Sequence, residues 1–180
     1  MGLLISSPNA QVFYHLDATP VTLWQLRGEK RMWVYPRQAP FVTDEEIERI
    51  VLRETAEQFP YRPDFDAGAQ VHEMTPGVMV SWPQNAPHRL VNGPMLNVSL
   101  SIEYLTPAAM LRANVIYANG VMRRRLGARP KVAEGYTPAN LAKFGLARAA
   151  KALKLQKATA VKTAPSFRLQ PGRPGELAAL

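Results

Sequence analysis

Short apolar runs separated by proline and glycine dominate the N-terminal part of the chain. Runs rich in valine, leucine and aromatic residues, bounded by turn residues, are typical of β-strands. They predict strands at residues 3–5, 11–16, 21–27, 30–35, 70–75, 78–82, 88–92 and 95–105. In the last of these, apolar and polar residues alternate through "LNVSLSIEY". Its polar residues, which include Asn97 and Ser99, therefore share one face, which is turned either to solvent or to a cavity.

Three segments carry the signals of helix N-termini. Thr43, with Glu46 three residues later, has the pattern of a capping box, and apolar residues follow it at helical spacing. Two Thr-Pro pairs place a capping residue before a proline at the first helical position, and they predict helices near 107–126 and 138–155. The segment 60–69 between the first helix and the next strand is expected to be a loop.

The pattern divides the chain into three parts: a mainly β core over residues 1–105, helices over 106–155, and a tail over 156–180 that is expected to be disordered. The net charge of +8 belongs to the C-terminal third, where twelve Lys and Arg residues between 123 and 168 accompany a single acid, Glu134. This region could bind nucleic acid, or it could be a solvated surface that aids solubility. The helices pack either on the β core or on a partner, so a homodimer formed through them is a further expectation.

The composition excludes several classes of protein. Cysteine is absent, which rules out disulfides, thiol nucleophiles and cysteine metal ligands. No apolar stretch approaches the 18 residues of a transmembrane helix, and the N-terminus lacks the features of a signal peptide. The sequence therefore predicts a cytoplasmic protein with no membrane partner.

The candidate chemistry lies in "YHLD" and in a later histidine. His15 and Asp17 are two residues apart, so on a strand they point to the same face. His88 stands at the start of another predicted strand. Two imidazoles and one carboxylate can form a facial triad, which leaves three positions of an octahedral metal open and suits non-haem Fe(II). The alternative is a histidine at a strand end that is satisfied by a backbone group, and the third histidine, His72, is interpreted in that structural way.

The surroundings of these residues resemble a known family. "YHLDATPVTLWQLRGEKRMWVYP" and "MTPGVMVSWPQNAPHRLVNGPMLNVSLSIEY" are similar to the JmjC-type, cupin-like 2-oxoglutarate oxygenases. The similarity rests on His-x-Asp, then Gln25, Gly28 and Lys30 in register, and then a Pro-Gly stretch that leads into His88. It covers residues 3–105. Family members usually have a longer segment before the first of these strands, so the chain is expected to be a minimal form or to lack the usual N-terminal part.

The resemblance implies a fold, a cofactor and an activity. The fold would be a double-stranded β-helix, or jelly roll, followed by α-helices. His15, Asp17 and His88 would bind Fe(II) as the catalytic centre, and Lys30 would bind the distal carboxylate of the cosubstrate 2-oxoglutarate. Asn97 and Ser99 would line the cosubstrate pocket. The implied activity is a dioxygenase that hydroxylates a protein or other macromolecular substrate.

Three positions depart from the family pattern. Val12, Val21 and Val78 stand where many relatives have polar residues that help to hold the cosubstrate. They leave the metal ligands in place and keep a second function open. In that alternative, the chain is a non-catalytic cupin-like module that binds a metal or ligand and regulates another protein.

Overall fold

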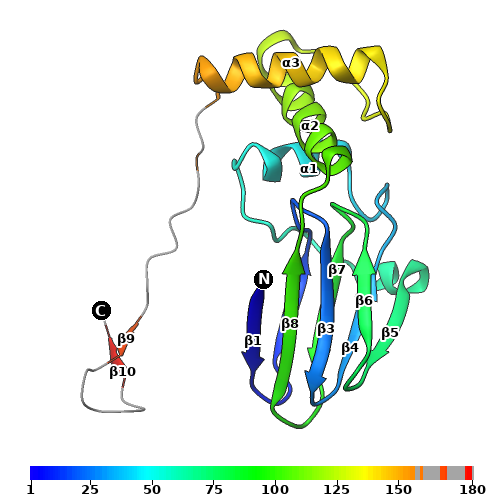
Figure 1. Ribbon diagram of the computed structural model, residues 1–180, viewed down its shortest axis with the longest axis vertical. Coiled ribbons are helices and arrows are strands. Elements are labelled where there is room, and N and C mark those ends of the chain that lie inside the picture. Colours follow the sequence, from blue (N-terminus) through cyan, green and yellow to red (C-terminus); the bar gives the residue numbers. More distant parts are fainter. Residues whose placement is uncertain (157–158, 160–166, 170–176, 180) are drawn as a thin grey trace.

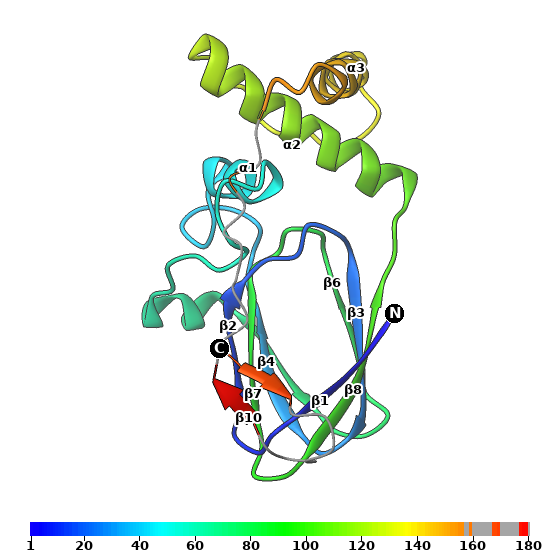
Figure 2. The ribbon, with the colours of Figure 1, turned by 90° about the vertical axis from the view of Figure 1, so that its left-hand side faces the viewer.

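The computed structural model describes residues 1–156, 159, 167–169 and 177–179. Its main body is a pair of four-stranded antiparallel sheets that face each other, with helices at one end (Figures 1 and 2). One sheet has the order β1-β8-β3-β6, and the other has the order β2-β7-β4-β5. Along the chain the strands alternate between the sheets, except that β4 and β5 are consecutive and pair in the second sheet, and this arrangement is the double-stranded β-helix. The predicted fold class is confirmed.

The strand boundaries lie close to those predicted from the apolar pattern. The first sheet consists of β1 (Gly2–Ser6), β8 (Asn97–Glu103), β3 (Val21–Arg27) and β6 (Met79–Trp82). The second consists of β2 (Gln11–His15), β7 (His88–Asn92), β4 (Lys30–Val34) and β5 (Gln70–Met74). Most strands pair with strands that are distant in the sequence. For example, β8 pairs with both β1 and β3.

A tight turn at Gly28 connects β3 to β4 and so carries the chain from one sheet to the other. Gly28 has φ +77°, a left-handed conformation that side chains disfavour. A Cβ atom there would also lie 2.6 Å from the carbonyl oxygen of Leu96. Glycine is therefore required at this point for two independent reasons.

The core of the barrel is formed by apolar residues from both sheets. They include Val21, Leu23, Met32, Val34, Met74, Val80, Trp82 and Leu90. The alternating exposure of β4 and β7 places every second side chain inside. Residues 30, 32 and 34 and residues 88, 90 and 92 therefore point inward.

The helices form as their N-terminal signals predict. The Thr43–Glu46 capping box is present at the start of α1 (Asp44–Val51). Threonine side chains accept hydrogen bonds from backbone N–H groups at the starts of α2 (Pro107–Leu126) and α3 (Pro138–Ala152). α2 packs against both α1 and α3, and the three helices lie beyond one end of the barrel (Figure 2). None of the helices in the described part of the chain is long and apolar enough to cross a membrane.

Two segments differ from the simple pattern. Residues 60–69, predicted to be a loop, contain the 3₁₀ helix η1 (Pro63–Gly68), because buried Phe65 packs with Tyr14 and Tyr35. Most of the tail predicted to be disordered falls outside the described residues. Within it, β9 (Phe167–Leu169) pairs antiparallel with β10 (Leu177–Ala179).

A candidate metal centre inside the barrel

His15 and His88 face each other across neighbouring strands. β2 and β7 pair antiparallel with His15 directly opposite His88, after a β-bulge between Val12 and His15. Directly opposed residues of an antiparallel pair project their side chains to the same face. The two imidazole rings accordingly lie with their centres 4.1 Å apart.

Asp17 completes a cluster of three potential ligands. One of its carboxylate oxygens lies 3.3 Å from Nε2 of His88, and the other lies 4.0 Å from Nε2 of His15. One ligand atom from each of the three residues falls within 4.8 Å of the others. The structure therefore brings together the three residues that the sequence picked out as ligands.

Backbone carbonyls determine which ring nitrogens are free. Nδ1 of His15 lies 2.8 Å from the carbonyl oxygen of Phe13, and Nδ1 of His88 lies 3.1 Å from that of Ala86. A carbonyl oxygen can only accept, so each Nδ1 carries the proton and donates it. In the neutral form of each ring, the Nε2 lone pair is then the one left free on the side of Asp17, which is the tautomer that a metal ligand needs.

Burial keeps His88 neutral. Its side chain is 2% exposed, and desolvation together with the charge of His15 lowers the pKa of His88 to about 3. Desolvation raises the pKa of Asp17, against the opposing influence of His15 and Trp82. The neutral Nε2 of His88 and the oxygen of Asp17 are then two acceptors 3.3 Å apart. Such a pair is unfavourable without a cation or a proton between them, so the donor set fits a divalent metal.

Two residues that the sequence did not indicate hold Asp17 in place. The indole Nε1 of Trp82 donates to the Asp17 carboxylate at 3.3 Å. Asn85 donates to the Asp17 carbonyl from both its backbone N and its side-chain Nδ2, each at 3.1 Å. Trp82 and Asn85 lie within six residues of His88, so one short segment supplies a ligand and supports another.

The triad opens into a cavity of about 480 Å³ inside the barrel. Its wall contains Lys30, Val12, Val21 and Asn92 among other residues. β4 pairs with β7 so that Val34 is opposite His88 and Lys30 is opposite Asn92. Lys30 is therefore four residues further along the same inner face, about 13 Å at the usual strand rise. A lysine side chain and a short dicarboxylate can together bridge that separation.

Lys30 is a buried cation that is held by polar side chains. It is 7% exposed, and its Nζ donates to Oγ of Ser99 at 2.8 Å. Ser99 in turn donates to Gln25 at 2.7 Å, and Gln25 donates to Asn97. Desolvation by burial lowers the pKa of Lys30. Ser99 thus touches the candidate cosubstrate anchor, whereas Asn97 acts one contact further away, through Gln25.

The other residues considered in the sequence lie outside this cluster. His72 is half-buried in β5 and is not among the grouped ligands of the described chain. Val78 packs against the barrel core. In the Arg123–Arg125 run, Arg123 and Arg124 bind the buried carboxylate of Glu48. Arg125 donates to the carbonyl of Leu155, so all three of these basic residues are used within the fold.

Comparison with known proteins adds a likeness of fold. No family model matches the sequence, and a search of curated proteins finds no relative. Among solved structures, Drosophila melanogaster CENP-C bound to CAL1 has 11% identity and a TM-score of 0.38 over 57% of this chain and 62% of that chain. A cupin superfamily protein from Desulfitobacterium hafniense has 12% identity and a TM-score of 0.35 over 58% of this chain and 64% of that one.

The strand order of the two sheets by itself establishes the double-stranded β-helix, or jelly roll. The solved structures with a similar fold include cupin domains. The neighbours also include a recombinant oxalate oxidase in complex with glycolate, with 10% identity and a TM-score of 0.36 over 55% of this chain and 38% of that chain. In all three of these neighbours, the match covers less than two thirds of the solved chain. Function must therefore be argued from the site itself.

Proposed function

We propose that the protein is an Fe(II)- and 2-oxoglutarate-dependent oxygenase that hydroxylates a protein or other macromolecular substrate. One observation carries the proposal. Two imidazoles and a carboxylate converge at one point of the barrel cavity, and a buried lysine lines the wall of that cavity. A three-ligand face leaves positions for a chelating cosubstrate, and a buried cation suits the distal carboxylate of a dicarboxylate.

Each residue has a defined part in this proposal. His15, Asp17 and His88 would hold the Fe(II), and Lys30 would bind the distal carboxylate of 2-oxoglutarate. When bound, Fe(II) with 2-oxoglutarate would supply the O₂-dependent oxidation of a C–H bond, with succinate and CO₂ as the products of the cosubstrate.

The surrounding residues position these groups. The Nδ1–H bonds to backbone carbonyls fix the orientation of both imidazoles, and the donor Trp82 steadies the carboxylate of Asp17. Ser99 directs the ammonium group of Lys30. Val21 and Leu23 give the cavity an apolar wall that excludes water.

Metal binding and turnover test the proposal together. The wild-type protein should bind Mn(II), used as a redox-stable stand-in for Fe(II), and should convert 2-oxoglutarate to succinate when Fe(II) and O₂ are supplied. His15→Ala and His88→Ala should each abolish both activities. His72→Ala is the matched control and should leave both unchanged. Succinate formation that persists at the wild-type rate in His15→Ala would refute the assignment.

The second candidate is a non-catalytic module that binds a metal or ligand and regulates another protein. Val12 and Val21, which line the cavity, favour it, because an apolar wall offers a cosubstrate few hydrogen bonds. Calorimetric titration of 2-oxoglutarate into the anaerobic Fe(II)-loaded protein separates the two functions. The oxygenase must bind the cosubstrate, whereas the regulatory module need not.

The C-terminal region carries two further proposals. Leu141, Leu146 and Leu153 of the α3 region are exposed, which supports a homodimer formed through the C-terminal helices. Light scattering of the wild type and of a Leu141→Ser, Leu146→Ser variant tests it: the mass should fall to that of a monomer in the variant. Nucleic-acid binding would rest on the remaining basic residues, and its affinity should fall steeply with salt.

A further inference from the structure

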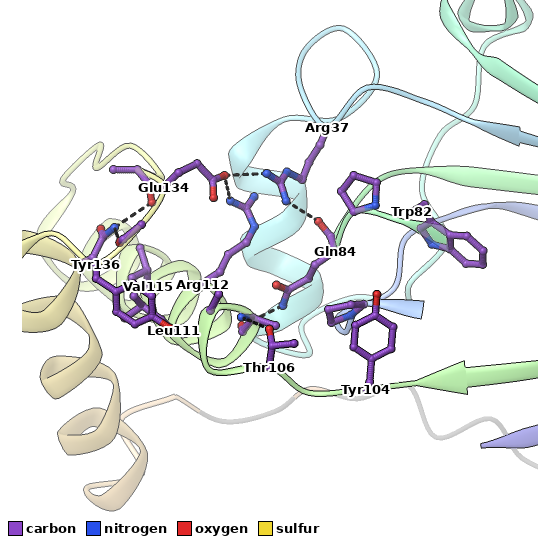
Figure 3. Close-up of a pocket in the computed structure, with 17 residues that line it drawn as sticks. Arg37, Trp82, Gln84, Tyr104, Thr106, Leu111, Arg112, Val115, Glu134 and Tyr136 are labelled. Carbon is purple, nitrogen blue, oxygen red and sulfur yellow. Dashed lines mark hydrogen bonds and ion pairs between the residues drawn. The ribbon is translucent and has the colours of Figure 1, made fainter. Parts of the chain in front are cut away.

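A second pocket, of about 350 Å³, lies between the rim of the barrel and the helices (Figure 3). Trp82, Pro83 and Tyr104 form its barrel side, and α2 and the segment before α3 form the rest. Trp82 also lines the cavity of the candidate metal centre, so the two spaces share a wall. The pocket contains no residue of the triad.

Two guanidinium groups meet in this pocket around one carboxylate. Nη2 of Arg37 and Nη1 of Arg112 both donate to Oε1 of Glu134, at 2.7 and 2.5 Å (Figure 3). Each arginine is also anchored to the segment before His88. Arg37 donates to the carbonyl of Gln84 at 2.9 Å, and Arg112 donates to the side chain of Asn85 at 3.3 Å.

The two arginine side chains are mostly buried, whereas the carboxylate between them is exposed. The Arg112 and Arg37 side chains are 10% and 25% exposed, but that of Glu134 is 67% exposed. Glu134 lies outside regular structure, on the connection between α2 and α3. Two neighbouring guanidinium groups repel each other unless an anion lies between them, and burial together with Arg37 lowers the pKa of Arg112. The two arginines thus form an anion site within the fold, and an exposed side chain occupies it.

A buried hydrogen-bond acceptor in the same pocket also lacks a partner. Asn140 lines the pocket and is 1% exposed. Its Nδ2 donates to the carbonyls of Ala133 and Gly135, which fixes the amide, but its Oδ1 has no hydrogen-bond partner among the described residues. This oxygen is itself enclosed by the protein, so it is an internal acceptor and not a contact for a ligand in the pocket.

We propose that this pocket binds an acidic residue of a peptide, whose side-chain carboxylate takes the place of Glu134 between Arg37 and Arg112. Glu134 is itself a glutamate on a peptide backbone, and it holds the place of this ligand in the free protein. The pocket is independent of the metal. The test of this proposal is therefore independent of the test of the oxygenase activity.

The size of the effect follows from the competition with Glu134. Two exposed ion pairs must be broken before a ligand can bind, and together they oppose it by a factor of about two to thirty. Glu134→Gln should therefore bind the ligand about twofold to thirtyfold more tightly than the wild type. Removing one arginine in addition should lower the affinity for the ligand by at least the factor that Glu134→Gln raises it.

The experiment is a titration followed by the amide shifts of the ¹⁵N-labelled, metal-free protein. The probes are N-acetyl-glutamate N-methylamide, its glutamine analogue, and butyrate as a free acid. The Glu134→Gln variant should bind the glutamate probe more tightly than the wild type, and neither protein should bind the glutamine analogue. Glu73→Gln is the matched control, because Glu73 is a similarly exposed carboxylate paired with Arg31 on the other side of the fold. It should leave the affinity unchanged.

Two arginine variants complete the test. Arg112→Gln and the less buried Arg37→Gln, each combined with Glu134→Gln, should weaken the glutamate probe at least tenfold. Equal affinity in the wild type and Glu134→Gln, or no loss in the folded Arg37→Gln protein, would overturn the proposal. Butyrate that binds as tightly as the peptide probe would overturn the peptide ligand in favour of a small organic acid.

Discussion

Replacing Lys30 with methionine should stabilise the protein and at the same time abolish binding of 2-oxoglutarate. Lys30 is 7% exposed, and in the described part of the chain no carboxylate lies within salt-bridge distance of its Nζ. The only compensation for the buried charge is one hydrogen bond, to Ser99. Methionine has a similar length and carries no charge, so it removes the cation and leaves the barrel filled.

The magnitude follows from two opposing costs. A buried ion costs several kcal/mol of solvation, and one charge-assisted hydrogen bond returns about 1.5–3 kcal/mol. Lys30→Met should therefore raise the free energy of unfolding of the ligand-free protein by about 1–2 kcal/mol. In the wild type, 2-oxoglutarate at a hundred times its dissociation constant should add about 2.7 kcal/mol, because it binds the folded state alone.

Urea denaturation of the Mn(II)-loaded protein, with and without 2-oxoglutarate, measures both quantities. Without 2-oxoglutarate, the free energy of unfolding of the variant should exceed that of the wild type. Adding 2-oxoglutarate should not raise the free energy of unfolding of the variant. Arg31→Met is the control, since Arg31 is the next residue of β4 and its side chain is 56% exposed. A Lys30→Met protein that keeps the full stabilisation by 2-oxoglutarate would refute the role of Lys30 as an anchor. A variant less stable than the wild type would refute the account of the buried charge.

Three further substitutions test the structure around the site, and urea denaturation measures the effect of each on stability. Gly28→Ala should cost about 2 kcal/mol or more, because φ there is positive and the new Cβ would lie 2.6 Å from the Leu96 carbonyl; a loss below 0.5 kcal/mol would contradict this. Glu48→Ala should cost about 2–4 kcal/mol, because it leaves Arg123 without its fully buried partner, whereas an exposed glutamate changed to alanine should cost little. Burial raises the pKa of Asp66, but hydrogen bonds from two tyrosines and an arginine outweigh it and hold the pKa below its usual value. Asp66→Asn should therefore lose stability at neutral pH, and its difference from the wild type should shrink as the pH falls below about 4; a difference independent of pH would contradict the assignment.

The strands and helix starts could be predicted because they depend on local patterns. Capping by Thr43 and the turn at Gly28 need only neighbouring residues, and both are present in the structure. The pairing order of the strands depends on contacts between distant segments, and here it came only from the resemblance. Phe65 shows the same limit, because its burial against distant tyrosines turns a predicted loop into a 3₁₀ helix.

The site shows a similar division. His15, Asp17 and His88 could be selected from residue type and spacing, and the structure groups them. The residues that hold Asp17 in place could not be selected from the sequence, because Trp82 and Asn85 act through contacts that only the folded chain reveals. The partner of Arg123 could not be predicted for the same reason, since Glu48 lies on another helix. The lone acid of the basic region, Glu134, was a visible signal, but its meaning required the position of two distant arginines.

The segment "WPQNAPH" connects the two pockets. Trp82 is the wall between them, Gln84 and Asn85 anchor the paired arginines, and His88 is a candidate ligand. The segment has a fixed shape despite lying outside regular structure, since Asn85 is buried with φ 64° and its amide binds the Asp17 carbonyl. A non-glycine residue in this conformation is strained unless its contacts hold it there. Asn85 touches Asp17 on one side and Arg112 on the other, so this one strained residue joins the candidate metal centre to the arginine pocket.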